Sequence, residues 1–253
     1  GFQHTRNRKK YLLRLYLANV GMVFFNQIMC MLQRKLDYVA YQPKNHNIFT
    51  TLFCAGVLIC IWENRKEKKK FFTYIGIYIF WQAMVMGLAI LAEAFDYVWR
   101  GNALLQTVLR TNYIFPLLGG IWDAEGGVFF IVLGVWLYCA VENKWKLALR
   151  YILFCGAYMF MCQGDILYRI MSRFSFWGYH KLADVIYFGS SFVGIPLGTS
   201  DLSLLTEFYQ WMMIGALPIM LACNGKRGKS LKWLFYAAYP LQFLVLYGIS
   251  YYK

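Results

Sequence analysis

Long runs of apolar residues, each bounded by charged residues, dominate the pattern of this chain. A helix needs roughly 20 apolar residues to cross a hydrocarbon layer about 30 Å thick, and seven runs approach or reach that length. The predicted spans are residues 11–32, 48–62, 71–92, 126–141, 147–162, 204–222 and 231–250. Because the runs are continuous and lack a period of two, they predict helices rather than strands.

Two further segments, residues 111–122 and 182–198, are interrupted by proline and by small residues, among them Pro116 and Pro196. Each is open to three interpretations: a full span, a re-entrant piece or an interfacial helix. Irregular backbone at membrane depth is tolerated only where protein buries it or where it lines a wet cavity. The pattern therefore predicts an all-α, polytopic transmembrane protein of seven to nine spans, in one domain covering residues 1–253.

Composition supports this class and excludes a water-soluble domain. Hydrophobic residues make up 60% of the 253 residues, charged residues make up 15%, and the mean hydropathy is +0.43. Typical soluble domains contain about 25% charged residues.

The net charge of +14 follows the predicted topology. Of the 26 Lys and Arg residues, 16 lie in four loops, residues 1–10, 63–70, 142–150 and 223–232. With seven spans the positive-inside rule makes these four loops cytoplasmic. With nine spans the loop at residues 163–181, which also holds three basic residues, takes the place of residues 142–150, so the rule does not separate the two counts. We therefore expect the lipid bilayer as a partner, with basic loops near anionic lipid, and no nucleic acid.

Cysteine and histidine residues indicate neither a disulfide framework nor a metal site. Six of the seven cysteines fall inside predicted spans, where a small thiol packs well. The histidines, His4, His46 and His180, are too scattered to suggest metal ligation.

Four motifs occur in a fixed order along the chain. They are GFQHTRNRKKYLLRL at the start, NIFTTL at residues 47–52, WDAEGGVFFIVLGVWLY at residues 122–138 and ALPIMLACNGKRGKSLKWLFYAAYPLQ at residues 216–242. Together they resemble the TraX family over essentially the whole chain. The resemblance implies a multi-pass protein of the bacterial cytoplasmic (inner) membrane, in a family associated with N-terminal acetylation of conjugative pilin.

The start of the chain looks like the end of one membrane helix running into a loop, so we expect an upstream part. The family pattern places a pair of helices before the GFQHT loop. Relative to the family, the chain is therefore expected to lack an upstream helix pair. Gln242 stands where that pattern has histidine.

Acetyl transfer requires a site that binds polyanionic acetyl-CoA, holds the acceptor, removes its proton and stabilises the oxyanion. No metal is needed, because the thioester is already activated. The candidate cofactor-binding residues are Arg6, Lys9, Lys10, Asn224, Lys226, Arg227 and Lys232. The alternatives are positive-inside charge for the basic residues and helix capping for Asn224.

His4, Asp123 and Glu125 are the candidate catalytic residues. His4 is the one histidine near a predicted basic site, where Arg6 would favour the neutral imidazole that a base requires, although it also suits a simple loop position. Asp123 and Glu125 lie between two Gly-Gly pairs where two apolar segments meet. Acidic groups at membrane depth are rare and often functional, whereas at the surface both would be ordinary carboxylates.

Tyr236 and Tyr239 lie three residues apart and share a face of the last predicted helix. With 20 tyrosines in the chain, packing is the simpler interpretation of this pair.

The function expected from these residues and from the resemblance is a membrane-embedded acyltransferase. It would move acetyl from cytoplasmic acetyl-CoA to the N-terminus of a pilin-like or other peptide, or to another amine or hydroxyl. The alternatives are a non-catalytic membrane scaffold or assembly factor, consistent with Gln242, and a small-solute transporter, against which the lack of an internal repeat argues.

Overall fold

A computed structural model describes residues 2, 5, 7–36, 47–98, 111–162, 173, 181, 209–222 and 232–251. The regular elements in these residues are all helical, which confirms the predicted all-α class. The ambiguous segment 182–198 lies outside the described residues. The chain forms two compact units: the first contains Gly1–Glu125 and Arg227–Lys253, and the second contains Gly126–Lys226.

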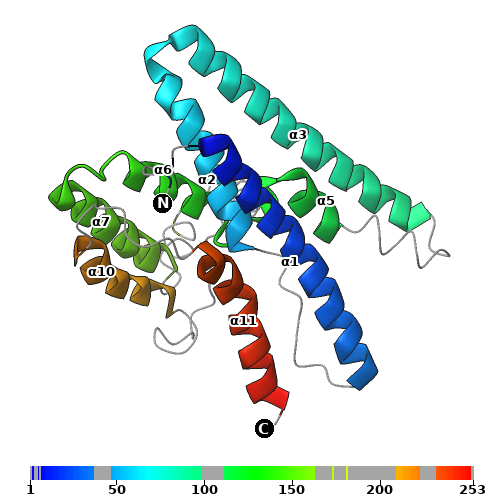
Figure 1. The fold of residues 1–253 in the computed structure, drawn as a ribbon. Helices are drawn as coiled ribbons and strands as arrows, with labels where there is room; N and C mark the ends of the chain where they lie inside the picture. Colours follow the sequence, from blue (N-terminus) through cyan, green and yellow to red (C-terminus); the bar gives the residue numbers. More distant parts are fainter. Residues whose placement is uncertain are drawn as a thin grey trace. The chain divides into compact units, whose positions relative to one another are not determined.

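Three long helices form the framework of the first unit. They are α1 (Arg8–Leu36), α2 (Ile48–Glu63) and α3 (Lys68–Val98), and a short turn, η2 (Asn64–Lys66), joins the last two. Two shorter elements follow, α5 (Thr111–Leu118) and η3 (Ile121–Asp123), and the C-terminal helix α11 (Lys232–Tyr251) completes the unit. Figure 1 shows α1 beside α2 and beside α11, and α5 beside α3.

Three helices are long and apolar enough to cross a membrane: Arg8–Met29, Ile48–Lys66 and Lys68–Ala92. They correspond to the first three predicted spans. Helices also occupy described parts of the other four predicted spans, but three of these are shorter apolar stretches, Gly127–Tyr138, Met212–Ala222 and Trp233–Leu246. The prediction of seven to nine spans therefore stays a prediction.

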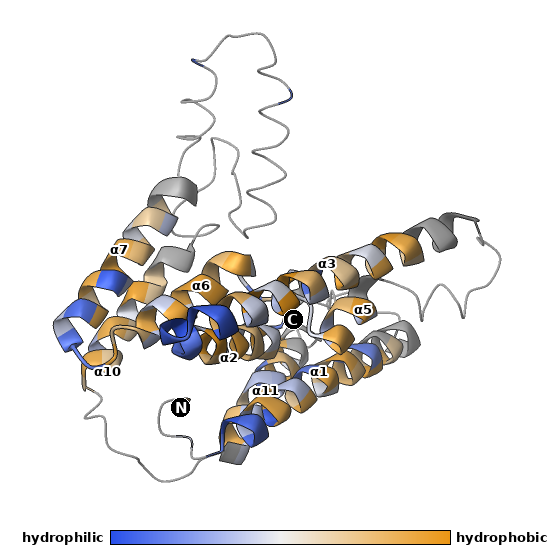
Figure 2. Cartoon of the chain, turned by 90° about the horizontal axis from the view of Figure 1, so that it is seen from above, coloured by the Kyte–Doolittle hydropathy of each residue, from blue (hydrophilic) through white to orange (hydrophobic). Residues whose placement is uncertain are grey.

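The outer surface of α3 is apolar, as a surface facing hydrocarbon must be. Apolar residues predominate along the helix in Figure 2. Phe80 is 73% exposed and Ile79 is 61% exposed. Exposed apolar patches on this scale are rare on soluble monomers and mark an interaction surface, which the predicted bilayer would cover.

A hydrophobic core joins α1, α2 and α11 in the first unit. Its buried members are Leu15, Met22 and Phe49. Partly buried hydrophobic residues pack around them, including Tyr11, Ala18, Leu52, Phe53, Tyr236, Tyr239 and Phe243. The last helix is therefore tied to the first two by aromatic packing, although Phe49 and Tyr239 are 190 positions apart in the sequence.

The second unit contains α6 (Gly127–Tyr138), α7 (Lys144–Cys162), η4 (Tyr209–Ala216) and α10 (Leu217–Ala222). Its core consists of Leu133, Tyr151, Phe154 and Cys155. The Tyr151 hydroxyl donates to the Met213 carbonyl at 2.7 Å, and the Lys144 ammonium donates to the Leu221 carbonyl at 2.7 Å. These two bonds fasten α7 to the η4–α10 segment.

Candidate functional site

The end of α5 is held by side chains from two of the long helices, α1 and α3. Four consecutive carbonyls accept hydrogen bonds: Pro116 from Asn19 Nδ2 (2.7 Å), Leu117 from the Tyr16 hydroxyl (2.6 Å), Leu118 from Trp81 Nε1 (3.0 Å) and Gly119 from Gln82 Nε2 (3.3 Å). The last carbonyls of a helix have no partner within the helix, and in hydrocarbon each unpaired group costs several kcal/mol. The four donors therefore allow the chain to break at this point.

The break itself depends on glycine. Gly119 has a φ of +66° and Gly126 has a φ of +74°, a backbone conformation that residues with a Cβ rarely adopt. Between them, the Ile121 backbone N–H donates to Gln82 Oε1 at 2.9 Å, so one glutamine holds both sides of the turn. The irregular backbone that the sequence suggested for residues 111–122 is confirmed.

Replacing Gly119 with alanine is expected to destabilise the first unit by about 1–3 kcal/mol. Alanine at this position would be held at a strained φ, and its Cβ would lie 2.9 Å from the Phe53 ring. Gly76 is the control, because alanine there would meet nothing within 4 Å and suits a helix. Thermal unfolding in detergent measures the difference, and equal melting temperatures for the two variants would contradict the assignment of strain at Gly119.

A buried polar network connects the break to α1 and α2. Asn19 Oδ1 accepts from Asn47 Nδ2 at 2.6 Å and from the Thr50 hydroxyl at 2.9 Å. Asn47 in turn caps α2, because its Oδ1 accepts from the Phe49 backbone N–H at 2.8 Å. Asn19, Asn47 and Thr50 are all buried. The network pairs polar groups that would otherwise be costly in an apolar interior.

The network lies near the middle of a candidate span. Asn19 is the twelfth of the 22 residues in Arg8–Met29. Asn19 contacts both the N-cap of α2, through Asn47, and the end of α5, through the Pro116 carbonyl. Whether residues 111–122 form a full span, a re-entrant piece or an interfacial helix stays a prediction.

Glu125 lies just after the break and is bonded through both its backbone and its side chain. Its carbonyl accepts from the Thr51 hydroxyl at 3.0 Å, and its carboxylate Oε2 accepts from the Tyr239 hydroxyl at 2.9 Å. The side chain is half-buried. The Tyr239 ring packs edge-on against Phe49, with ring centroids 5.5 Å apart. A carboxylate that accepts a hydrogen bond from a phenol can also accept a proton or bind an amine.

All four motifs contribute to this region. Tyr11 belongs to the first motif, Phe49 and Thr51 to the second, Glu125 to the third and Tyr239 to the fourth. Tyr11 and Tyr239 both pack on the core that contains Phe49. We call these five residues the motif cluster. Segments far apart in sequence thus meet in one unit.

The structure locates only some of the predicted site residues. Glu125 belongs to the motif cluster, and Lys9 and Lys10 are exposed at the start of α1, where Asn7 Oδ1 accepts from the Lys10 backbone N–H at 3.0 Å. Asp123 lies in η3 and Lys232 begins α11, but their side chains are not among those described. The remaining predicted residues, His4, Arg6, Asn224, Lys226 and Arg227, lie outside the described residues.

Sequence reasoning missed Asn19 and Thr51, and it assigned Tyr239 to packing. The sequence contained some indication of both residues, because Thr51 lies in the NIFTTL motif and because an asparagine such as Asn19 is unusual in an apolar run. Nothing in the sequence paired Thr51 or Tyr239 with Glu125. Among the described residues, no group of three or more His, Cys, Asp or Glu residues is placed to hold a metal ion.

Comparisons of the chain with models of known protein families, with curated proteins and with solved structures found no match. The similarity to the TraX family therefore depends on the four motifs alone.

Proposed function

We propose that the protein is an acetyl-CoA-dependent acyltransferase embedded in the bacterial inner membrane, with a TraX-like multi-pass organisation. The observation that supports the proposal is the motif cluster, in which Glu125 accepts hydrogen bonds from Thr51 and Tyr239, while Tyr11 and Tyr239 pack on the core that contains Phe49. The acceptor is a peptide N-terminus, pilin-like or other, or another amine or hydroxyl.

In this proposal Glu125 is the general base. The acceptor nitrogen attacks the thioester carbonyl carbon and gives its proton to the carboxylate, so that a C–N bond forms while the C–S bond breaks. The thiolate of CoA then leaves and takes up the proton. The Tyr239 hydroxyl, 2.9 Å from Oε2, orients the carboxylate, because a hydrogen-bonded oxygen has a fixed direction. His4 and Asp123 stay predicted members of the same site.

The basic loops would hold the phosphates of acetyl-CoA. Lys9 and Lys10 are exposed at the start of α1, on the predicted cytoplasmic side. Arg6, Asn224, Lys226, Arg227 and Lys232 are the further candidates. Exposed lysines and the backbone N–H groups at the start of a helix both favour a bound phosphate. The predicted cytoplasmic position of these residues suits a donor, acetyl-CoA, that is cytoplasmic.

The same contacts also favour a second candidate, the non-catalytic scaffold. Through Thr51 and Tyr239, Glu125 links α2 and α11 to the broken segment, which is a structural role in its own right. Transfer of radiolabelled acetyl from acetyl-CoA into proteins, peptides or lipids of membrane vesicles separates the two. Label should enter an acceptor only in vesicles that contain the protein. Equal labelling in vesicles without it would favour the scaffold.

A further inference from the structure

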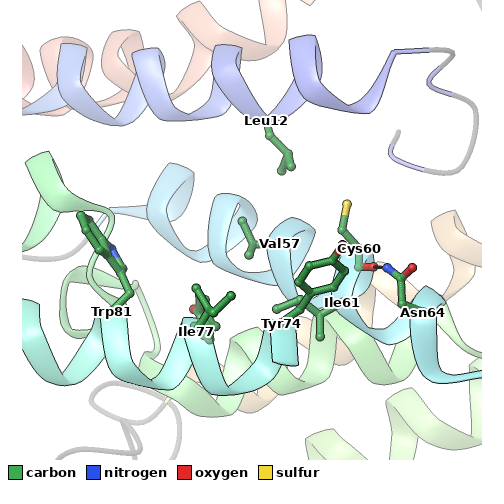
Figure 3. A pocket seen from close by; sticks show the side chains of 9 residues that line it. Leu12, Val57, Cys60, Ile61, Asn64, Tyr74, Ile77 and Trp81 are labelled. Carbon is green, nitrogen blue, oxygen red and sulfur yellow. Dashed lines mark hydrogen bonds between the residues drawn. The ribbon is translucent and has the colours of Figure 1, made fainter. Parts of the chain in front are cut away.

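An open apolar groove runs between the three long helices of the first unit. Its volume is about 420 Å³. Leu12 reaches it from α1, Val57 and Cys60 line it from α2, and Tyr74, Ile77 and Trp81 line it from α3 (Figure 3). The volume lies within the range of about 300–1,000 Å³ that is usual for ligand pockets. The groove can therefore hold an elongated apolar group.

One end of the groove adjoins a dense basic rim. The rim consists of the start of α1 (Arg8, Lys9, Lys10) and the turn from α2 to α3 (Arg65, Lys66, Lys68, Lys69, Lys70). The Arg8–Glu63 ion pair holds these two segments together. Eight basic residues face two acidic ones, Glu63 and Glu67, so the rim carries a net charge of +6.

Both acidic side chains of the rim are occupied by ion pairs. Glu63 binds Arg8, and Glu67 binds Lys70 at 2.6 Å. Lys66, Lys68 and Lys69 are exposed beside them. Asn64, in the same turn, belongs to the groove lining, so the cationic rim and the apolar groove are continuous. Such a surface complements a ligand with an anionic head and an apolar tail.

We propose that this groove binds one anionic phospholipid, with an acyl chain in the groove and the phosphate on the basic rim. The groove extends about 10 Å along α3, since seven residues separate Tyr74 from Trp81 and each adds about 1.5 Å. Tyr74, one turn after Lys70, is of a residue type that favours the boundary between head groups and hydrocarbon. A zwitterionic lipid lacks the net negative charge that matches the rim, and a soluble anion lacks the tail that fills the groove.

Lys9 and Lys10 belong both to this rim and to the proposed acetyl-CoA site, so the proposal is tested by lipid binding, which does not require acetyl transfer. Delipidated full-length protein in detergent is incubated with phosphatidylglycerol or with phosphatidylcholine of the same acyl chains, and native mass spectrometry counts bound lipid. Ile77→Trp fills the groove, and Ile79→Trp is its matched control. The two isoleucines are 60% and 61% exposed, and two residues on a helix place them on nearly opposite faces. Lys68→Gln with Lys69→Gln weakens the rim.

We expect one phosphatidylglycerol to bind at least tenfold more tightly than phosphatidylcholine. Ile77→Trp should weaken phosphatidylglycerol binding at least fivefold and Ile79→Trp less than twofold. The double lysine variant should reduce the preference for phosphatidylglycerol about tenfold, because each basic residue near anionic lipid contributes up to about fivefold. Melting temperatures confirm that the variants are folded. Equal binding of the two lipids, or equal effects of the two tryptophans in folded protein, would overturn the proposal.

Discussion

Replacing Glu125 with glutamine should lower the rate of acetyl transfer by about 10²- to 10⁴-fold, the usual contribution of a positioned general base. Glutamine has the size of glutamate, and its amide oxygen still accepts the hydrogen bond from the Tyr239 hydroxyl. The Thr51 bond is to the backbone carbonyl and does not change. The substitution therefore removes the proton acceptor and leaves the contacts that fold the region.

Initial rates of acetyl incorporation, with acetyl-CoA at a saturating concentration, measure this effect. Glu142→Gln is the control, because Glu142 is an exposed carboxylate and also loses one negative charge. We expect the control to keep the wild-type rate and both variants to keep the wild-type melting temperature. A Glu125→Gln protein with full activity would remove Glu125 from the chemistry and leave it only the structural link.

Replacing Asn19 with alanine should destabilise the first unit by about 2–5 kcal/mol. The substitution leaves the Pro116 carbonyl without its donor from Asn19, and it leaves Asn47 and Thr50 without their shared acceptor. Each unsatisfied buried group costs about 1–3 kcal/mol in soluble proteins. In membrane helix bundles, a single hydrogen bond contributes about 0.6 kcal/mol of stability on average. Because the three bonds meet at one buried side chain, the losses accumulate.

Thermal unfolding in detergent measures this loss. A dye that reacts with newly exposed cysteines reports the unfolding. Leu17→Ala is the control on the same helix, because Leu17 is 57% exposed and its substitution should change stability by no more than about 0.5 kcal/mol. Equal melting temperatures for the two variants would show that the network around Asn19 does not hold α1, α2 and α5 together.

The sequence predicted the helices far better than the site. Membrane-length helices have a strong local signal, since uninterrupted apolar runs identify them without any knowledge of neighbours. Pro116 and the nearby glycines marked residues 111–122 as an interrupted segment but left it open between a full span, a re-entrant piece and an interfacial helix. What the sequence did not contain is which side chains satisfy the freed carbonyls, because Tyr16, Trp81 and Gln82 are neighbours of α5 only in three dimensions.

The same distinction applies to the site. Glu125 was predicted from its rarity, as an acidic residue between apolar segments, and its catalytic role stays a prediction. The structure adds the hydrogen bond from the Tyr239 hydroxyl to its carboxylate. Lys9 and Lys10 were predicted from charge, and their exposure at the start of α1 is compatible with phosphate binding. The contact of Tyr239 with Glu125 depends on the packing of the last helix against α1 and α2, which has no local sequence signal.

Binding of acetyl-CoA to the purified protein is the most direct test of the proposed function, because it does not require the acceptor to be known. The comparison is between wild-type protein and a variant with Lys226→Ala and Arg227→Ala, both shown to be folded by thermal unfolding. We predict micromolar binding by the wild type and at least tenfold weaker binding by the double variant. Absence of binding by folded wild-type protein, supplied with any upstream segment that it naturally carries, would contradict the acyltransferase and favour the scaffold.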